Sequence, residues 1–396
     1  MEVLVTCKQY PYPLENGENL RIFHYVRALR DRHQFDLVCL GKTPPPEAIR
    51  PLFRRIIPNA DPETVRPEGL ARVVASFSVK HIIPPMPAFT RTIAEAMRET
   101  RYDVVWSSSD IVSSLPQLHG VPLLADIVDD MVTQYRRELV RAKTPLDYAR
   151  GVKRLQMVKA YERRYFRSAD ACLFVSEVDA GDFSSVCPGT PAHVIPNGVD
   201  ADHFRPMDTP VEPGRLVFEG SMMFPPNADA AIHFVERILP LIRAVDPTVK
   251  LTLVGRDPLP AVQALASDAV EVTGFVDDVR PYIAKAALFV APLRSGAGIK
   301  NKVLQAWAMG KAVVATPEST GGLRVEPDRN IVVRAEPAEF AKAVLDLLRD
   351  TGRSAAIGQA ARETIERHYT WQAKAEELEA LMQELRTRTP SQVAHA

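Results

Sequence analysis

Cysteine, net charge and long apolar runs are all scarce in this chain. Its 396 residues contain four scattered cysteines, with no CxxC or Cys/His cluster to indicate a zinc site or a disulfide framework. Basic and acidic residues balance at 49 each, which argues against a general nucleic-acid-binding protein. No apolar run approaches the ~20 residues of a membrane span, and no signal peptide precedes the first strand. We therefore expect a cytoplasmic protein.

Apolar residues are plentiful, at 46% of the chain, and they form short β-rich runs that alternate with helical patterns. This alternation is typical of parallel βα units. The expected strands are residues 3–6, 35–40, 102–107, 122–128, 171–176, 216–219, 250–255, 270–274, 288–291, 312–316 and 331–333. A Pro- and Asp-rich stretch at residues 200–214 divides them into two series. The sequence thus predicts an α/β fold of two doubly wound domains, with a nucleotide between them at the carboxyl ends of the strands.

The most informative stretch is residues 287–316, where a buried strand, a glycine turn, a helix and a second buried strand follow one another. The turn contains Gly296 and Gly298, and the apolar spacing after it is helical. A glycine turn that opens a helix presents backbone N–H groups and the positive end of the helix dipole to an anion. Lys300 and Lys302 add positive charge at the same place. This unit predicts a binding site for a phosphorylated ligand.

The same turn partly matches a dinucleotide fingerprint. Gly296 and Gly298 correspond to its first two glycines, and Glu318 follows about 20 residues later, as the fingerprint expects. Three features argue against it: Asn301 replaces the third glycine, two lysines crowd the turn, and the unit lies late in the chain. An ordinary βα turn is the other alternative. We favour nucleotide-phosphate binding over both.

Several motifs resemble those of the retaining GT-B glycosyltransferases, the group 1 or family 4 enzymes. The segment PLRSGAGIKNKVLQAWAMGKAVVAT, at residues 292–316, is similar to the nucleotide-sugar segment of that family. Further similarities to the domain junction, the strands of the second domain and the C-terminal helix lie at residues 194–200, 218–221, 253–256, 272–278 and 368–371. The motifs within residues 194–320 are specific, and those before residue 169 are weak. The resemblance spans essentially the whole chain and is closest to bacterial sugar transferases of polysaccharide and natural-product pathways.

This resemblance implies a GT-B fold, in which two Rossmann-like domains face each other across a cleft. The acceptor-side domain would span residues 1–206, the nucleotide-sugar domain residues 207–368, and a C-terminal helix at residues 369–396 would cross back to the first domain. The implied activity moves a hexosyl group, with retention, from a nucleotide-diphosphate sugar of UDP or GDP to a glycan, lipid-linked or small-molecule acceptor. No metal or other cofactor is expected.

The resemblance also assigns roles to individual residues. Because cleavage of the sugar C1–O bond builds negative charge on the leaving diphosphate, cations at the cleft edge are the expected catalytic tool. Lys300, Lys302 and Arg294 are the candidates, with Asp126 on the acceptor side. The residues expected to bind the nucleotide-sugar are Gly17, Gly220, Ser221, Arg256, Phe275, Gly296, Ala297, Gly298, Ile299 and Gln305. The alternative is that one or two of the cations are solvated surface residues, as single Lys and Arg side chains usually are.

Two departures from the family pattern leave other functions open. The family usually carries glutamates at the positions of Ala297 and Gln305. Gln305 can still hydrogen-bond a ribose, but without a charge. A GT-B sugar-nucleotide epimerase, or a non-catalytic GT-B partner protein, therefore remains an alternative.

Candidates in the first half of the chain are less specific. The loop before Gly17 either approaches the donor phosphates or is a plain βα loop. Asp126, Asp129 and Asp130 follow a strand, where carboxylates either grip sugar hydroxyls or serve as turn and N-cap residues. His24 and His119 are more typical of structural roles. Prolines at residues 44–46 and 84–87 bracket a weakly periodic region, which we interpret as an irregular insertion on the acceptor side.

A local charge bias is hidden by the zero net charge. Residues 136–167 contain eleven basic side chains against three acidic ones: Arg136, Arg137, Arg141, Lys143, Arg150, Lys153, Arg154, Lys159, Arg163, Arg164 and Arg167 against Glu138, Asp147 and Glu162. The apolar spacing from residue 148 onward is helical, so one face can pack while another projects cations. This predicts a peripheral contact with an anionic membrane surface, at the inner face of the membrane. The alternative is a solvated helix face.

Overall fold

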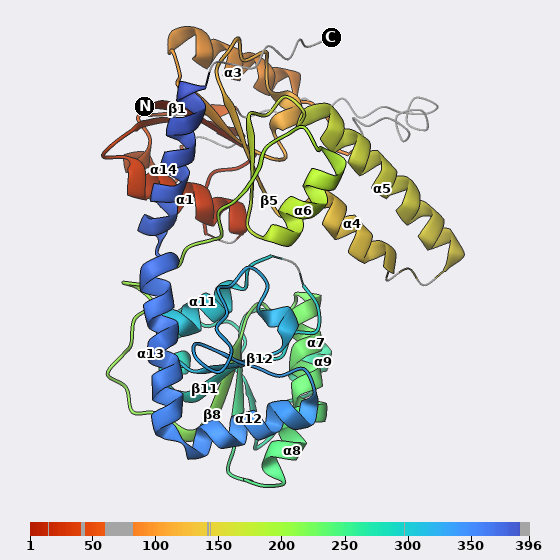
Figure 1. Ribbon diagram of the computed structural model, residues 1–396, viewed down its shortest axis with the longest axis vertical. Coiled ribbons are helices and arrows are strands. Elements are labelled where there is room, and N and C mark those ends of the chain that lie inside the picture. The colour runs from red at the N-terminus through yellow and green to blue at the C-terminus, as the bar shows by residue number, and fades with distance from the viewer. Residues whose placement is uncertain are drawn as a thin grey trace. The chain divides into compact units, whose positions relative to one another are not determined.

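The computed structural model describes residues 1–14, 16–40, 44–59, 82–140, 142, 144–296 and 298–388 (Figure 1). The chain divides into two compact units. The N-terminal unit comprises Met1–Pro196 together with Lys374–Ala396, and the C-terminal unit comprises Asn197–Ala373. The sequence prediction placed these limits at residues 206 and 368.

The N-terminal unit is built on a seven-stranded parallel sheet in the order β3-β2-β1-β4-β5-β6-β7. Its strands are β1 (Glu2–Cys7), β2 (Gln34–Leu40), β3 (Arg55–Asn59), β4 (Val104–Ser108), β5 (Leu123–Val128), β6 (Ala171–Phe174) and β7 (Ala192–Val194). The strand order reverses between β1 and β4, where Val3 lies opposite Val104. Apolar runs such as that of β1, buried almost throughout, suit a sheet that is covered on both faces.

Helices follow the strands of this unit. They are α1 (Gly17–Leu29), α3 (Pro87–Glu99), α4 (Met131–Val140), α5 (Pro145–Tyr165), α6 (Glu177–Val186) and the 3₁₀ segments η1 (Glu47–Leu52) and η3 (Val112–Ser114). The last helix, α14 (Trp371–Thr387), begins in the C-terminal unit. The Glu379 carboxylate of this helix lies 2.6 Å from Arg32 Nη1 and 2.7 Å from His33 Nε2. These contacts anchor the helix to the N-terminal unit.

The C-terminal unit has a six-stranded parallel sheet in the order β10-β9-β8-β11-β12-β13. Its strands are β8 (Glu212–Glu219), β9 (Lys250–Val254), β10 (Val270–Val272), β11 (Ala286–Ala291), β12 (Val313–Ala315) and β13 (Val332–Val333). The order reverses between β8 and β11, where Leu216 pairs with Leu288. In open parallel sheets of this kind, ligands bind outside the carboxyl ends of the strands at such a reversal.

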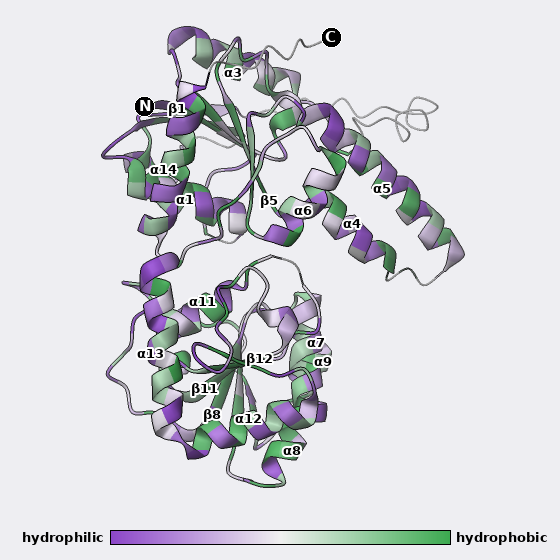
Figure 2. Cartoon of the chain, viewed as in Figure 1, coloured by the Kyte–Doolittle hydropathy of each residue, from purple (hydrophilic) through white to green (hydrophobic). Residues whose placement is uncertain are grey.

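Helices cover both faces of the second sheet, and the strands between them are strongly apolar (Figure 2). The helical segments are α7 (Pro225–His233), η4 (Phe234–Ile238), α8 (Leu239–Arg243), α9 (Pro260–Gln263), α10 (Arg280–Lys285), α11 (Asn301–Ala308), η5 (Pro317–Ser319), α12 (Pro337–Arg349) and α13 (Thr351–His368). One core contains Phe234 and Phe340, and the other contains Phe289 and Trp307. Within the described part of the chain, no helix has the length and apolar character to cross a bilayer.

The fold class is confirmed: the chain forms two doubly wound parallel sheets. Every strand expected from the sequence is present, but β3 and β7 were missed. Both lie at the edges of the first sheet. The region that we expected to be an irregular insertion begins with η1 and then supplies β3 as a regular parallel strand, and its residues 60–81 lie outside the described residues.

Candidate functional site

The predicted phosphate turn lies at the point where the strand order of the C-terminal sheet reverses. β8 ends at Glu219 and is followed by Gly220, while β11 ends at Ala291 and leads into the loop before α11. The Gly220 N–H donates to Val254 O at 2.9 Å, and the Met222 N–H donates to Arg256 O at 3.0 Å. The turns after β8 and β9 are therefore joined side by side at the carboxyl edge of the sheet.

Lys302, in the first turn of α11, points its ammonium into this edge. Nζ donates to Asn227 Oδ1 at 2.6 Å and lies 4.7 Å from the centre of the Phe218 ring. Burial lowers the pKa of Lys302 to about 8; Glu219 opposes this shift and Lys300 adds to it. Burial also raises the pKa of Glu219, an effect that Lys302 opposes. The site thus holds a desolvated cation whose hydrogen-bond partner is a neutral amide.

Because Gly220 has no side chain, there is room beside it for the Lys302 ammonium. A Cβ at this position would lie 2.6 Å from Lys302 Nζ and 2.7 Å from Asn227 Nδ2, and the backbone φ is +146°. Both the contact and the backbone conformation exclude a side chain. The neighbouring turn is equally tight, because a Cβ at Gly255 would lie 1.9 Å from Gly220 O. The two glycines therefore allow the turns to close around the lysine.

Asn227 is a site residue that the sequence prediction missed. It lies in the first turn of α7 and is 7% exposed. Its Nδ2 donates to Ser221 O at 2.9 Å, while its Oδ1 accepts from Lys302. The side chain thereby connects the turn after β8 to α11. The signal available in the sequence was the run Pro225-Pro226-Asn227, which places an asparagine at the start of a helix directly after a glycine turn.

Lys300 lies in the loop that leads into α11 and is 7% exposed. Its Nζ donates to Gly298 O at 2.7 Å. Gly296 and Gly298 adopt φ values of 124° and 64°, in the region that favours glycine. Ala297, between them, lies outside the described residues. Ile299 is half-buried against the core that contains Trp307.

Asn301 occupies the position of the third glycine in a dinucleotide fingerprint and has a different structural role. Asn301 begins α11, and its Oδ1 accepts from Asn197 Nδ2 at 3.3 Å. Asn197 is 3% exposed. Glu318 is exposed in η5, beyond β12. Asn301 therefore secures the segment that joins the two units, a contact that glycine could not make.

The remaining predicted residues of this unit surround the turns with different degrees of exposure. Ser221 follows Gly220 and is half-buried, Gln305 is half-buried on α11, Arg256 is exposed, and Phe275 is 70% exposed. Their assignment to the nucleotide-sugar stays a prediction.

Arg294 is placed differently from the two lysines. Its guanidinium donates to both carboxylate oxygens of Asp229, at 3.0 and 2.5 Å, and its side chain is 52% exposed. These hydrogen bonds raise the pKa of Arg294. Its charge is already matched by a carboxylate on α7, so Arg294 is held as half of an exposed ion pair.

Asp126, in the N-terminal unit, is also half of an ion pair. Both of its carboxylate oxygens lie 3.1 Å from Arg21 Nε, and both side chains are almost fully buried. Arg21 Nη1 also donates to Ile195 O at 2.8 Å. The acceptor role expected for Asp126 stays a prediction.

The other candidates of the N-terminal unit have clear local functions. Gly17 begins α1, where Asn16 Oδ1 accepts from the Asn19 N–H and caps the helix. Asp130 Oδ2 accepts from the Thr133 N–H at 2.7 Å, an N-cap contact. Glu18 was not predicted: burial, followed by Asp110, raises its pKa to about 7.

His24 is 8% exposed and lies 5.3 Å from the Phe23 ring, edge to face. His119 is exposed, in a left-handed backbone conformation with φ of 47°. Across the residues that the structure describes, no group of three His, Cys, Asp or Glu side chains could hold a metal ion.

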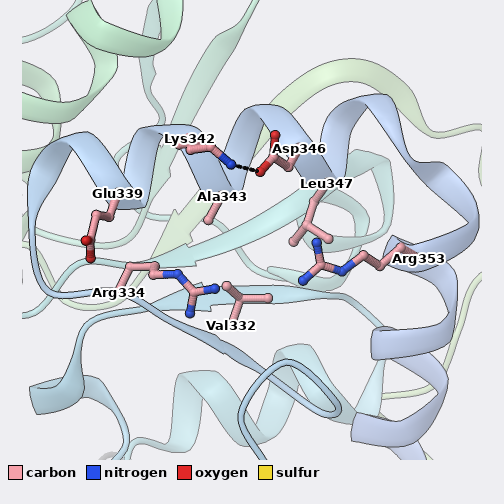
Figure 3. Close-up of a pocket in the computed structure, with 8 residues that line it drawn as sticks. All are labelled: Val332, Arg334, Glu339, Lys342, Ala343, Asp346, Leu347 and Arg353. Carbon is pink, nitrogen blue, oxygen red and sulfur yellow. Dashed lines mark hydrogen bonds and ion pairs between the residues drawn. The ribbon is translucent and has the colours of Figure 1, made fainter.

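A cavity of about 240 Å³ lies elsewhere in the C-terminal unit, between β13 and α12 (Figure 3). Most of its charged lining residues are ion-paired. Lys342 contacts Asp346 at 2.8 Å, and Arg334 and Arg353 both contact Oδ1 of Asp328, which lies outside the lining, at 3.1 and 3.3 Å. Because carboxylates match these cations, the cavity differs in kind from the phosphate turn.

Two family models together match most of the chain. One, described as "Glycosyltransferase Family 4", covers residues 16–203, and the other, "Glycosyl transferases group 1", covers residues 213–350. The chain belongs to the group 1 (family 4) glycosyltransferases. The family resemblance noted from the sequence is confirmed.

Similar proteins agree with this assignment. An uncharacterized 44.6 kDa protein in the cps region of Klebsiella pneumoniae is 22% identical over 87% of this chain and 90% of its own length. A GDP-mannose-dependent monoacylated alpha-(1-6)-phosphatidylinositol monomannoside mannosyltransferase of Corynebacterium glutamicum is 22% identical over 77% of this chain and 82% of its own. HepE of Anabaena, solved in complex with UDP, is 15% identical, with a TM-score of 0.67 over 97% of this chain and all of its own. The transferase is therefore an enzyme of GT-B fold.

Proposed function

We propose that this transferase moves a hexosyl group from a nucleotide-diphosphate sugar to an acceptor hydroxyl, with retention of configuration at C1. The observation that carries the proposal is the ammonium of Lys302, held by neutral Asn227 at the strand-order reversal. The named relative that uses GDP-mannose and the neighbour that binds UDP support a nucleoside diphosphate as the leaving group. The proposal leaves open whether the nucleobase of the donor is uracil or guanine.

The proposed reaction breaks the bond between sugar C1 and the β-phosphate oxygen and forms a bond between C1 and the acceptor oxygen. Negative charge develops on the departing diphosphate, where preorganised cations and N–H groups are most effective. Lys302 and Lys300 supply the cations, and the glycine turn before α11 supplies N–H groups. Because burial disfavours the charged form of Lys302, an arriving diphosphate gains an under-solvated counter-charge.

The acceptor proton passes to the leaving phosphate oxygen in this proposal. The two lysines take the part that a divalent metal would play, so no metal is required. Gln305 contacts the ribose, and backbone N–H groups of the turn compensate for the glutamate that Ala297 replaces. The relative encoded in a cps region supports a role in polysaccharide biosynthesis. A lipid-linked acceptor and a peripheral membrane contact complete the proposal.

Donor-dependent release of nucleoside diphosphate tests this function. The transferase is incubated with UDP- and GDP-hexoses, with and without candidate acceptors, and the product is analysed by NMR for its anomeric configuration. Acceptor-dependent release with an unchanged anomeric configuration is expected. A donor converted to its epimer without transfer would indicate an epimerase. Nucleotide binding without any turnover would indicate a partner protein, and an inverted product would overturn retention.

A further inference from the structure

The α4–α5 hairpin projects from the N-terminal unit. α4 and α5 run antiparallel, and their connected ends extend away from the sheet (Figure 1). The middle of α5 is anchored, because Leu155, Val158 and Tyr161 are buried in the core of this unit. At the start of the helix, by contrast, each of residues 144–150 is exposed. Among the described residues of the unit, none covers the first turn and a half of α5.

The extended end carries large apolar side chains. Val140, the last residue of α4, is 87% exposed, and Leu146 and Tyr148 of α5 are 58% and 55% exposed. Single exposed apolar residues need no explanation, but several large ones at the end of one projection indicate an interaction site. We define these three residues as the hairpin tip.

Basic side chains continue from the tip along the outer face of α5. Leu146, Arg150, Lys153, Met157 and Arg164 recur at intervals of four, three, four and seven residues, so they lie on one face of the helix. All are exposed except Met157, which is half-buried. Between residues 145 and 161, Asp147 is the only acidic residue in the sequence. It pairs with Arg150 at 4.0 Å. This face is therefore strongly cationic.

Another long surface helix shows what an ordinary solvated face looks like in this molecule. α13 matches its cations with acids one turn away, as in Arg362 with Glu366 at 2.6 Å and Arg367 with Glu363 at 3.2 Å. Those pairs suit a helix that faces water. On the outer face of α5, Arg150 also pairs with Asp147, but the sequence has no second acidic residue between 145 and 161, so basic residues are in excess behind the apolar tip.

We propose that the hairpin tip inserts into the headgroup region of an anionic membrane while the outer face of α5 binds the lipid phosphates. This inference deepens the peripheral contact proposed above and rests on that function only in supposing an acceptor at the membrane. The order of side chains suits a bilayer surface, because apolar residues enter the acyl boundary and long basic residues keep their charges among the headgroups. Charge complementarity favours anionic lipid over an apolar protein partner.

Vesicle sedimentation of the full chain tests the proposal. We expect binding to vesicles of phosphatidylcholine with 30% phosphatidylglycerol, weak binding to pure phosphatidylcholine, and loss of binding as salt is raised, since screening shortens the range of the interaction. Removing one basic residue from a membrane-bound face lowers affinity by roughly fivefold. Arg150→Glu with Lys153→Glu should therefore lower it about 30-fold or more.

The matched control reverses two equally exposed charges in the C-terminal unit. Arg329→Glu with Lys342→Glu changes the net charge by the same amount at side chains that are 67% and 77% exposed, and it should leave vesicle binding unchanged. Leu146→Glu tests the tip separately and should weaken binding at every salt concentration. Equal losses in the control and hairpin variants would overturn a specific surface, as would equal binding to both vesicle types or binding to neither.

A tryptophan at the tip gives a direct readout of insertion. Tyr148→Trp adds an exposed indole to a chain whose own Trp106, Trp307 and Trp371 are buried. Its emission should shift to shorter wavelength with anionic vesicles and be quenched by brominated lipid. An unshifted spectrum with bound vesicles would place the contact elsewhere. If the protein self-associates and Leu146→Glu abolishes this, the tip binds a second copy of the chain and the membrane proposal is overturned.

Nucleotide release with a water-soluble acceptor separates this proposal from the proposed function. The hairpin variants should keep that activity, because none of their residues belongs to the phosphate turn. Turnover without vesicle binding would overturn the hairpin proposal alone. Vesicle binding without turnover would leave the hairpin proposal standing and overturn the transferase mechanism.

Discussion

Two buried cations of this molecule, one in each unit, are held in opposite ways. In the N-terminal unit, Arg21 is paired with the carboxylate of Asp126 and with a backbone carbonyl. In the C-terminal unit, Lys302 is hydrogen-bonded to the neutral amide of Asn227. Both lie near the carboxyl ends of parallel strands. Asp126 is hydrogen-bonded to Arg21 and makes a structural pair with it. Lys302 donates instead to an amide, and the nearby Glu219 carboxylate only opposes the lowering of its pKa.

This difference ranks the predicted cations. Arg294, which the sequence placed beside the two lysines, follows the pattern of Arg21, since Asp229 matches its charge. Lys300 donates from Nζ to the neutral carbonyl of Gly298. The comparison therefore favours Lys302 over Arg294 as a contact of a diphosphate.

The largest expected effect is on stability and comes from breaking the pair in the N-terminal unit. Asp126→Asn leaves the Arg21 guanidinium buried without its carboxylate, and Arg21→Met leaves Asp126 alone. Either change should lower the free energy of unfolding of this unit by about 3–5 kcal/mol, because an uncompensated charge remains buried. Urea denaturation followed by circular dichroism measures the loss.

The double variant Arg21→Met with Asp126→Leu provides the control. It should recover much of the stability, because neither charge is left alone. Single variants that lose less than about 1 kcal/mol would show that the pair is not structural, and would return Asp126 to the candidates for acceptor contact.

The next effect is on catalysis in the C-terminal unit. Lys302→Ala and Lys300→Ala should each lower kcat/KM by roughly 100-fold, as expected for one preorganised electrostatic donor. The change in stability of Lys302→Ala should be small, since the relief of the desolvation penalty offsets the lost hydrogen bond to Asn227. Steady-state assays of nucleoside diphosphate release measure the change, and activity within a few-fold of the parent would remove that lysine from the site.

Lys311 offers a matched control for these two lysines. Burial lowers its pKa to about 8 as well, but its ammonium donates to Ala284 O at 2.6 Å and Ala286 O at 2.8 Å, at the end of α10. Lys311→Met should lower stability and leave the kcat/KM of the folded enzyme nearly unchanged. This result would show that a pKa lowered by burial does not by itself indicate a role in catalysis.

A smaller effect is expected in the pH dependence of nucleotide binding. Burial lowers the pKa of Lys302 from an ordinary 10.5 to about 8. Between these values the unfolded chain holds the proton and the folded protein does not, so the contribution of Lys302 to stability rises with pH across this window. The affinity for a nucleoside diphosphate falls as pH rises, because the diphosphate favours protonated Lys302. Binding above pH 8 therefore takes up a proton from solution.

Calorimetry at pH 8.5 in two buffers of different ionisation enthalpy measures this proton uptake. We expect uptake on binding of the nucleoside diphosphate by the parent and none by Lys302→Ala. Affinity should fall by up to tenfold per pH unit above pH 8. Equal enthalpies in the two buffers for the parent would contradict contact between Lys302 and the phosphates.

The smallest effect concerns the helix that carries Lys302. Gln305→Glu should strengthen hydrogen bonds to a ribose hydroxyl by about 1 kcal/mol, roughly fivefold in affinity, because the acceptor becomes charged. A 2′-deoxy nucleotide should gain less. Titration of both nucleotides against both proteins tests the placement, and an unchanged preference for ribose would show that position 305 does not contact the sugar.

Most strands could be predicted from the sequence because their apolar runs are continuous and buried. β3 and β7 could not, since they are edge strands: β3 contains Pro58 and is only half-buried, and β7 has three half-buried residues. An edge strand needs neither a long apolar run nor a full set of sheet hydrogen bonds. The glycine turn and its two lysines were also visible, because turn and helix signals are local.

The sequence by itself determined the βα alternation, the glycine turn, both lysines and the cationic stretch that includes α5, since each depends on neighbouring residues. Only the tertiary structure decided which cations are hydrogen-bonded to a carboxylate. Arg21 meets Asp126 across 105 positions of the chain, and Lys302 meets Asn227 across 75. Such partners are chosen by strand order and register, which bring distant turns to one sheet edge. Whether a buried charge faces a carboxylate or an amide is therefore not encoded in any local pattern.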